Sequence, residues 1–443
     1  MKIRFVTLGC KLNFAESSAI GKALLQQGHT RAKQGEEADI CVINTCSVTD
    51  NADHKDRQTI HRIHRQNPNA IIIVTGCYAQ LQPDQITQIE GVDYVLGQNE
   101  KYEITQLVDD IERLRDSLED ASLQDAASGY SLEAQKIRVA NIREVEEFHG
   151  AYSKDDRTRC FLKVQDGCNY FCTYCTIPYA RGKSRNPKIE EVVKDAQEAI
   201  SQGAKEIILT GVNIGDFGRS TGESFLELLR ALDGLEAKGE RREAKGMDYR
   251  IRISSCEPNL LTDEIIDFVA QSKHFAPHFH IPLQSGSNEV LSIMKRRYTR
   301  ELFEERVQHI KQVMPHAFIG VDCMVGVRGE TEEYFNDYVE FIKRLDVSQL
   351  HVFTYSERAN TRMLELDVCI VPKAERQRRS KILHEISEEK TRTFYANQTG
   401  REAIVLWESK KEGDQMAGFT ENYVKVYRPY DKAKVNTFEV IRL

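Results

Sequence analysis

The stretch FLKVQDGCNYFCTYCTIPYARG, residues 161–182, joins an apolar run to a CxxxCxxC motif formed by Cys168, Cys172 and Cys175. The run FLKV predicts a strand, so the three cysteines fall in the loop directly after it. Three thiolates on one short loop can hold three irons of a 4Fe–4S cube and leave the fourth iron without a protein ligand. The motif therefore predicts an iron–sulfur site.

An iron without a protein ligand can bind S-adenosylmethionine and pass one electron to its sulfonium, which releases a 5′-deoxyadenosyl radical. Tyr174, between the second and third cysteines, is placed to shield the cluster or to contact the adenine. The alternative is a structural zinc site, which needs four ligands. Cys160 lies before the strand and no histidine stands at finger spacing, so the motif favours radical chemistry.

Outward from this loop, apolar runs alternate with helix-length segments, which is typical of a (β/α) barrel. Six such runs predict a partial barrel over residues 158–372: 161–167, 206–211, 250–255, 279–284, 318–326 and 349–356.

Residues 1–102 show the same alternation and predict a parallel α/β sheet. Cys10, Cys46 and Cys77 each follow one of its strands, and the carboxyl ends of parallel strands meet at one edge of a sheet. These cysteines are either convergent ligands or core residues. We expect the remaining cysteines to be small core residues: Cys41, Cys160, Cys256, Cys323 and Cys369.

Residues 103–157 are charged and predict a linker that contains a helix near residues 104–118. Residues 373–443 predict a helix over 373–396 followed by three β runs, EAIVLWE, FTENYVKVYR and TFEVIRL, hence a small antiparallel β-barrel. This region carries 15 Lys and Arg residues against 11 Asp and Glu residues. Basic and aromatic side chains together favour RNA contact, although some of the aromatic residues must face a core.

The whole chain has a net charge of -7, which argues against indiscriminate nucleic-acid binding. No run approaches the roughly 20 apolar residues of a membrane span, and the first residues do not resemble a secretory signal. We therefore expect a cytoplasmic protein. In a reducing compartment, eleven cysteines indicate metal binding or catalysis in place of disulfides.

Several separate motifs resemble the methylthiotransferase family of radical S-adenosylmethionine enzymes over nearly the whole chain. They are TLGCKLN, INTCSVT, VTGCYAQ, CNYFCTYCTIPYARG, LTGVNIGDFG, RISSCEPN, HIPLQSGS and GFTENYVKV, the last similar to a TRAM RNA-binding barrel. The resemblance implies that Cys10, Cys46 and Cys77 hold a second 4Fe–4S cluster, at which sulfur is methylated and delivered. It also implies two molecules of S-adenosylmethionine per turnover, one as methyl donor and one as radical source.

The segments GCKLNFAES and NTCSVTDNADHKDRQ resemble those of the branch that modifies N6-threonylcarbamoyladenosine at position 37 of tRNA. The resemblance thus implies conversion of that nucleoside to its 2-methylthio derivative in the anticodon loop. An electron donor protein such as flavodoxin or ferredoxin is then expected, and the sulfur donor stays open. The alternatives are the isopentenyladenosine branch, the branch acting on a ribosomal-protein aspartate, and a non-catalytic iron–sulfur RNA-binding protein.

The family motifs also suggest residues that bind the cofactor or the RNA. For each, a structural role is the open alternative. Cofactor contacts are expected, besides Tyr174, from Gly211, Asn213, Ser255, Glu257, His280 and Gln284. RNA contacts are expected from Arg181, Arg185, Phe419, Tyr423, Lys425 and Arg428. One departure is the segment GVRGET, residues 326–331, where Val327 and Arg328 replace an aromatic residue and a proline typical of the family.

Overall fold

A computed structural model describes residues 1–443 except residues 34, 121–135, 154–157 and 236–246. The chain divides into two compact units. Unit 1 comprises Met1–Glu147 and Thr176–Lys183, and unit 2 comprises Phe148–Cys175 and Ser184–Leu443. The segment that directly follows the third cysteine of the CxxxCxxC motif therefore belongs to unit 1, although sequence analysis places it inside the barrel domain. The expected domain boundaries stay a prediction.

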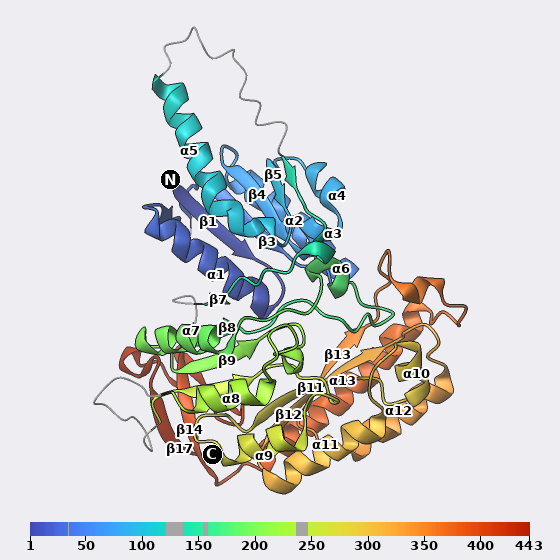
Figure 1. Ribbon diagram of the computed structural model, residues 1–443. Coiled ribbons are helices and arrows are strands. Elements are labelled where there is room, and N and C mark those ends of the chain that lie inside the picture. Colours follow the sequence, from blue (N-terminus) through green and yellow to red (C-terminus); the bar gives the residue numbers. More distant parts are fainter. Residues whose placement is uncertain (34, 121–135, 154–157, 236–246) are drawn as a thin grey trace. The chain divides into compact units, whose positions relative to one another are not determined.

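Unit 1 is built on a parallel sheet of order β2-β1-β3-β4-β5-β6, drawn in blue to teal in Figure 1. The expected strands are present. Its strands are β1 Lys2–Thr7, β2 Thr30–Arg31, β3 Ile40–Thr45, β4 Ile71–Gly76, β5 Tyr94–Leu96 and β6 Ile137–Arg138.

Helices cover both faces of this sheet, because β3 and β4 are apolar on both sides and need cover on each. One face packs on α1 and α5, and the other packs on α2, α3 and α4. The expected helix near residues 104–118 is α5. The helices are α1 Lys11–Gln26, α2 Asp50–Gln66, α3 Cys77–Leu81, α4 Pro83–Thr87, α5 Ile104–Asp120 and α6 Ile177–Arg181, with 3-10 turns at Glu100–Glu103 and Ile142–Glu144.

Unit 2 contains the expected partial barrel, with each predicted strand in place. The parallel strands β8, β9 and β10 form one sheet, which β7 extends as an antiparallel edge strand, and β11, β12 and β13 form another. Isolated parallel bridges, such as that between Ser255 and His280, join β10 to β11. The strands are β7 Ala151–Tyr152, β8 Arg159–Lys163, β9 Glu206–Thr210, β10 Arg250–Ile253, β11 His278–Gln284, β12 Phe318–Val325 and β13 Gln349–Thr354.

The barrel helices other than α10 bury apolar faces against these strands in one continuous core, and Val290 of α10 packs in a separate cluster. Several begin at a Ser or Thr whose side chain accepts a hydrogen bond from the first turn, which fixes where each helix starts. They are α7 Ile189–Ser201, α8 Phe225–Asp233, α9 Asp263–Gln271, α10 Asn288–Ile293, α11 Arg300–Val313 and α12 Glu332–Arg344, with 3-10 turns at Ile214–Asp216 and Arg362–Glu365.

The C-terminal part has the expected long helix, α13 Lys373–Ala396, and an antiparallel sheet of order β16-β15-β14-β17. Its bounds are β14 Glu402–Glu412, β15 Gln415–Thr420, β16 Lys425–Pro429, a 3-10 turn Lys432–Lys434, and β17 Phe438–Arg442. The run FTENYVKVYR, expected as one strand, is a strand, a turn and a second strand. Asn422 causes the turn, because its buried side-chain NH2 group donates hydrogen bonds to His316 O and Gln398 Oε1, which lie outside the sheet.

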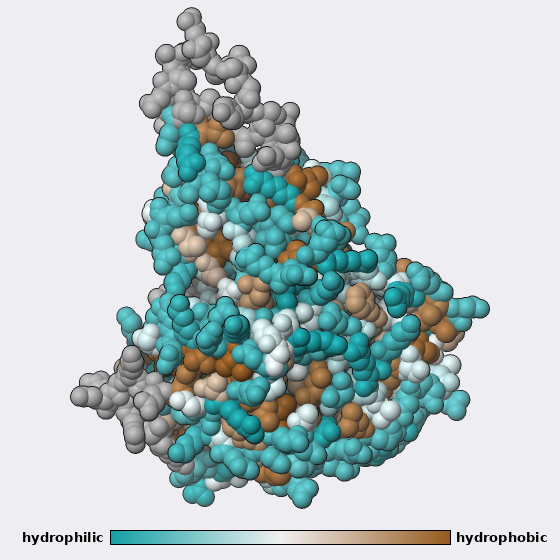
Figure 2. Space-filling view, viewed as in Figure 1, coloured by the Kyte–Doolittle hydropathy of each residue, from teal (hydrophilic) through white to brown (hydrophobic). Residues whose placement is uncertain are grey.

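The face of the molecule in Figure 2 is predominantly hydrophilic, with hydrophobic side chains in separate patches. Among the helices that the structure describes, none is long and apolar enough to cross a bilayer.

Candidate active site

Cys10, Cys46 and Cys77 lie at the carboxyl ends of three adjacent strands of unit 1. Cys10 follows β1 and caps α1, Cys46 follows β3, and Cys77 follows β4 as the first residue of α3. Registers that pair Thr7 with Asn44 and Thr45 with Gly76 bring these ends side by side. The convergence expected from the sequence is therefore observed.

The loops carrying these cysteines are tightly packed at two glycines with positive φ. Gly9 has a φ of +92°, and a Cβ there would lie 2.8 Å from Cys46 Sγ. Gly76 has a φ of +102°, and a Cβ there would lie 2.4 Å from Thr45 O. Because L residues rarely adopt this backbone and no space exists for a side chain, both positions require glycine.

Two of the three thiols, those of Cys46 and Cys77, are buried in a protein environment that disfavours the free thiolate. Burial, with the nearby Cys77 and Cys10, raises the pKa of Cys46 to about 12. Burial also raises the pKa of Cys77, although the charge of Arg181 opposes this effect. Cys10 is exposed. Thiolates are the metal-binding form, so a bound cation is what would hold Cys46 and Cys77 deprotonated at neutral pH.

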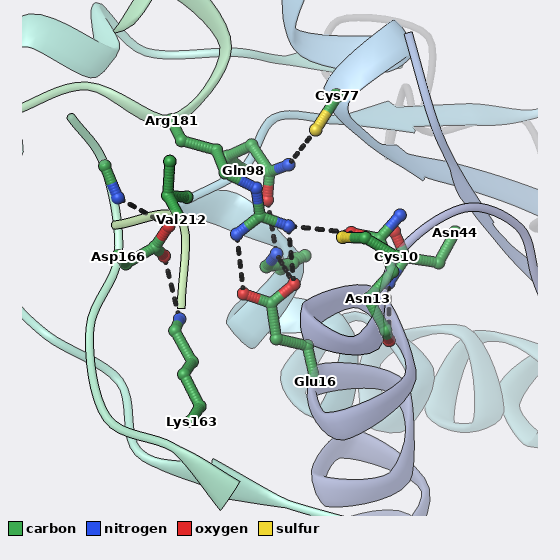
Figure 3. Close-up of polar contacts among 12 residues, drawn as sticks. Cys10, Asn13, Glu16, Asn44, Cys77, Gln98, Lys163, Asp166, Arg181 and Val212 are labelled. Carbon is green, nitrogen blue, oxygen red and sulfur yellow. Dashed lines mark hydrogen bonds and ion pairs between the residues drawn. The ribbon is translucent and has the colours of Figure 1, made fainter. Parts of the chain in front are cut away.

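Asn13 ties two of the cysteine loops together inside unit 1. Its Nδ2 donates to Leu8 O at 2.8 Å and to Thr45 O at 2.9 Å, the carbonyls just before the Cys10 and Cys46 loops. Its Oδ1 accepts from Arg181 Nη2 at 2.7 Å (Figure 3). Arg181, expected as a possible RNA contact, is buried here and forms an ion pair with Glu16 at 3.1 Å. RNA contact by Arg181 stays a prediction.

In unit 2, the loop carrying Cys168, Cys172 and Cys175 follows β8. Asp166, just before the loop, accepts from Lys163 Nζ at 2.8 Å and from Arg185 Nη2 at 3.3 Å. Arg185 is therefore engaged in a buried ion pair, and its contact with RNA stays a prediction. The loop curls back on itself, because the Cys175 amide donates to Cys172 O at 3.0 Å and the Tyr170 amide donates to Cys168 Sγ at 3.4 Å. Burial raises the pKa of Cys168 to about 12, and the neighbouring Cys172 adds to this rise.

Arg296 brings two of the expected cofactor residues to this loop. Its Nη1 donates to Cys172 Sγ at 3.2 Å and to the Tyr174 hydroxyl at 3.4 Å. Its Nη2 forms an ion pair with Glu257. Burial raises the pKa of Glu257, and Arg296 opposes that rise. Arg296 lies in the loop after α10, between the exposed side chains of Lys295 and Arg297.

The other expected cofactor residues lie at the ends of barrel strands. Gly211 follows β9, and a Cβ there would lie 2.9 Å from Gln165 Oε1, which accepts from the amides of Val212 and Asn213. Ser255 is bridged to His280, and His280 Nε2 lies 2.7 Å from Asp322 Oδ1. Gln284 ends β11 with a φ of +64°.

Family patterns and relatives agree on what this arrangement is. A pattern described as "Uncharacterized protein family UPF0004" matches residues 2–97, and that of the Radical SAM superfamily matches residues 162–342. The threonylcarbamoyladenosine tRNA methylthiotransferase MtaB of Bacillus subtilis (strain 168) is 38% identical over 96% of this chain and 89% of that protein. The protein of the same name from Aquifex aeolicus (strain VF5) is 35% identical over 97% of each. This chain belongs to the radical SAM methylthiotransferase family.

Another relative in the family is a tRNA-2-methylthio-N(6)-dimethylallyladenosine synthase of Pelotomaculum thermopropionicum (strain DSM 13744 / JCM 10971 / SI), which is 31% identical over 94% of this chain and 88% of that protein. Among solved structures, the radical S-adenosylmethionine methyltransferase TsrM from Kitasatospora setae aligns with a TM-score of 0.56 and 15% identity. The alignment covers 79% of this chain and 72% of that chain, and it supports the fold alone.

Membership of the radical SAM methylthiotransferase family implies a 4Fe–4S cluster and S-adenosylmethionine for this chain. The donor set fits, because three thiols share one loop at the end of β8. The polar lining fits as well. Both polar atoms of the buried Asn213 side chain, and the buried Oε1 of Gln284, have no hydrogen-bond partner in the described part of the chain. Buried polar groups need partners, and a polar cofactor would supply them.

In this methylthiotransferase the residues expected to bind RNA fall into two groups. Phe419 stacks on Tyr423 at 4.9 Å between ring centroids, and Tyr423 packs on Phe318 of the barrel at 5.5 Å. Lys425 and Arg428 instead lie on the outer part of the C-terminal sheet, paired with Glu412 at 3.3 Å and Glu439 at 2.6 Å. RNA contact by these four residues stays a prediction, but Phe419 and Tyr423 are half-buried against the barrel and do not lie on an open surface.

Of the five scattered cysteines, four are buried as expected, and Cys369 is exposed, so the core expectation was wrong there. It lies in the connection before α13, beside the exposed side chain of Ile370. Sequence reasoning also missed several polar residues around the cysteines. Of these, Asn13 and Glu16 stand inside the segment GCKLNFAES, which was a usable signal, whereas the rest have no local signature: Gln98, Lys101 and Arg296.

Proposed function

We propose that this protein is a tRNA methylthiotransferase that converts N6-threonylcarbamoyladenosine at position 37 to its 2-methylthio derivative. The observation that carries the proposal is that Cys10, Cys46 and Cys77 converge at neighbouring strand ends, in a chain that also has the CxxxCxxC loop. A radical enzyme that only abstracts hydrogen needs one such set of thiols. A second set supports an enzyme that also holds sulfur for insertion.

Each set of cysteines would hold one 4Fe–4S cluster, and two molecules of S-adenosylmethionine would be used per turnover. When bound, these groups supply the radical that removes hydrogen from the adenine and the methylated sulfur that replaces it. The chain's own residues do the positioning. Arg296 directs an N–H at Cys172 and balances the buried carboxylate of Glu257, while Asn213 and Gln284 offer unpaired polar atoms to the cofactor.

Two observations favour the threonylcarbamoyl nucleoside over the dimethylallyl one. They are the sequence segments around Cys10 and Cys46, and the names of the relatives with 38% and 35% identity. The tRNA base would come from the anticodon loop, where single-stranded bases are readily splayed out for recognition. We further propose a flavodoxin or ferredoxin as electron donor and the cytoplasm as location, consistent with thiol ligands that need a reducing compartment.

The test is nucleoside mass spectrometry of tRNA from a deletion strain complemented with variants of this chain. We expect the 2-methylthio derivative of threonylcarbamoyladenosine to vanish in the deletion strain and to return with the natural chain. Cys168→Ala and Cys10→Ala should each fail to restore it. Cys369→Ser, a change at an exposed cysteine outside both sets, should restore it.

Loss of the 2-methylthio derivative of isopentenyladenosine alone would transfer the chain to the dimethylallyl branch. Unchanged tRNA with a lost modification on a ribosomal protein would support the aspartate branch. A purified, reduced protein that forms no 5′-deoxyadenosine from S-adenosylmethionine would contradict any enzymatic assignment and leave an iron–sulfur RNA-binding protein.

A further inference from the structure

A continuous series of buried polar contacts links Cys77 to Cys10 within unit 1 (Figure 3). At one end, Gln98 Nε2 donates to Cys77 Sγ at 3.0 Å. At the other end, Cys10 Sγ lies 3.8 Å from Asn13 Oδ1. Between the side-chain amides of Gln98 and Asn13 lie three charged residues in direct contact, in the order Lys101, Glu16 and Arg181.

The centre of the series is Glu16, whose carboxylate is shared by two cations. Lys101 Nζ binds Glu16 Oε2, and Arg181 donates to both carboxylate oxygens at 3.1 and 3.2 Å. The side chains of Lys101 and Arg181 are each 1% exposed, and that of Glu16 is 0% exposed. Three fully buried charges therefore meet next to the proposed ligands of the second cluster.

The two cations determine how the neighbouring amides point, because ammonium and guanidinium groups only donate hydrogen bonds. Lys101 Nζ donates to Gln98 Oε1, so Gln98 must turn its NH2 group to Cys77. Arg181 donates to Asn13 Oδ1, so Asn13 must turn its NH2 group to the carbonyls of Leu8 and Thr45. Without the cations, either amide could rotate by half a turn.

A purely stabilising role accounts poorly for this cluster. Replacing a buried ion pair by apolar residues is often neutral or favourable for stability, so burial of three charges is weak evidence of a stability function. An N–H aimed at a cysteine sulfur has a more direct consequence. Hydrogen bonds to the sulfurs of an iron–sulfur cluster are among the factors that set its reduction potential.

We propose that Lys101, held by Glu16 and Arg181, is a positioning residue that locks the Gln98 N–H on Cys77 and thereby raises the reduction potential of the cluster bound by Cys10, Cys46 and Cys77. The inference rests on the proposed function, since it requires that these cysteines hold a cluster. The N–H stabilises negative charge on the thiolate, so it favours the reduced cluster, which carries one more electron. Lys101 acts through Gln98 and not by touching the cluster.

The experiment uses the full-length chain with Cys168→Ala, Cys172→Ala and Cys175→Ala, so that only the second cluster contributes to the signal. After anaerobic reconstitution, iron is counted and the midpoint potential is followed by EPR-monitored redox titration. Gln98→Leu should lower the midpoint by about a tenfold change in the oxidised-to-reduced ratio, which is ~59 mV for a one-electron couple. Lys101→Met should lower it in the same direction.

The decisive comparison is the double variant. Because Lys101 acts through Gln98, Lys101→Met should add nothing to the shift of Gln98→Leu. Gln80→Leu is the matched control. Gln80 Oε1 accepts from the backbone N–H of Gln98 at 2.9 Å, but the Gln80 side chain makes no contact with a cysteine in the described structure. The midpoint potential of this variant should therefore stay at that of the parent.

An unchanged midpoint in Gln98→Leu overturns the inference. The inference is also overturned if Lys101→Met shifts the midpoint equally in the parent and in the Gln98→Leu variant, because the lysine would then act by its charge alone. If Lys101→Met does not take up iron, Gln98→Glu decides the question. It keeps an acceptor for Lys101 and sets an oxygen against the sulfur, and a midpoint no lower than that of the parent overturns the inference. A parent chain that binds no iron contradicts the proposed function itself.

Discussion

At the scale of single residues, the cysteines could be predicted and most of their polar neighbours could not. Cys10, Cys46 and Cys77 each stand directly after an apolar run, and this local pattern fixes them at strand ends that a parallel sheet brings together. Gln98 meets Cys77 and Arg296 meets Cys172 across long sequence separations. Nothing around Arg296 in the sequence distinguishes it from its exposed basic neighbours.

Gly9 gives a prediction about the second cluster. Gly9→Ala would force an alanine to a φ of +92° and place its Cβ 2.6 Å from Cys46 Cβ. The backbone strain alone costs about 1–3 kcal/mol, and the clash must displace the Cys46 loop. We expect the reconstituted variant to lose about half of its iron and to keep the cluster of the CxxxCxxC loop, as measured by iron content and EPR.

Gly28→Ala is the matched control, because Gly28 has a φ of +95° with nothing within 4 Å of the added Cβ. It carries the same backbone strain in open space. Full iron content in this variant and loss in Gly9→Ala would show that packing at Cys46 matters. Equal iron content in both would contradict the account of Gly9.

Arg296 gives a prediction about the radical-forming loop. Arg296→Gln removes the N–H that reaches Cys172 Sγ at 3.2 Å and leaves the buried Glu257 without its cation. Loss of such supporting contacts typically costs about 10- to 100-fold in metal affinity or activity. We expect a decrease of that order in the rate of 5′-deoxyadenosine formation, measured by chromatography under reducing conditions.

Arg297→Gln serves as the comparison for Arg296→Gln. The Arg297 guanidinium packs 4.1 Å from the Tyr170 ring centroid and donates to Asn169 O. No contact of Arg297 with a cysteine is present among the described residues. A comparable loss in both variants would mean that general damage to the loop, and not the N–H at Cys172, explains the effect.

At the scale of elements, periodicity predicted the longer strands and helices of the parallel sheets, because apolar runs and amphipathic stretches alternate cleanly there. It missed β2, β6 and β7, which have two residues each and carry no period, and it read the end of β15, the turn and β16 as one strand. That turn depends on contacts of Asn422 with His316 and Gln398, which are distant in the sequence. The GVRGET departure is also absorbed by distant partners: Val327 is buried beside Tyr355, and Arg328 pairs with Glu357 at 2.9 Å.

The elements β9 and β10 are joined to the C-terminal sheet by a buried charge cluster. Glu206 of β9 pairs with Arg250 and Arg252 of β10. Arg250 also donates to Ile404 O at 3.0 Å and to Phe419 O at 2.8 Å, which are carbonyls of the C-terminal sheet. Burial alone would raise the pKa of Glu206, but the two arginines outweigh it and lower that pKa.

Glu206→Gln should therefore destabilise the protein by about 3–5 kcal/mol at neutral pH, because it leaves two buried arginines without their counter-charge. A depressed carboxyl pKa contributes stability above the unfolded-state value of about 4.3 and loses it as pH falls through the folded-state value. The gap in urea unfolding midpoint between wild type and Glu206→Gln should thus be constant near neutrality and shrink below about pH 4.

Glu304→Gln is the control for the pH series, since Glu304 pairs with the exposed Arg344 at 3.1 Å. Surface ion pairs of this kind contribute roughly 0–1 kcal/mol, so its unfolding midpoint should remain near that of wild type. A gap for Glu206→Gln that grows as the solution becomes more acidic would contradict the assigned direction of the pKa.

At the scale of the whole molecule, the C-terminal sheet belongs to the same compact unit as the barrel, so some of its aromatic side chains pack on the barrel and others are exposed. Sequence composition predicted that aromatic and basic residues would gather in this sheet, but it could not say which of them face the barrel. Phe419 and Tyr423 pack toward Arg159, whose guanidinium lies 4.9 Å from the Phe419 ring centroid. Tyr427 and Tyr430 are exposed, with Lys425 4.7 Å from the Tyr427 ring centroid and Lys411 5.4 Å from that of Tyr430.

We therefore expect Tyr427→Ala to weaken tRNA binding by about 1–3 kcal/mol, the usual loss when a base–aromatic stack is removed. Lys411→Gln should weaken binding less and reduce the slope of log affinity against log salt concentration by about one phosphate contact. Phe419→Leu should instead lower the thermal unfolding temperature and leave tRNA affinity unchanged at temperatures where the variant is folded. Fluorescence anisotropy with labelled tRNA across a salt series measures the affinity of all three variants, and a thermal melt measures the unfolding temperature of Phe419→Leu. A larger loss of affinity in Phe419→Leu than in Tyr427→Ala would place the RNA on the barrel side of the sheet and overturn this assignment.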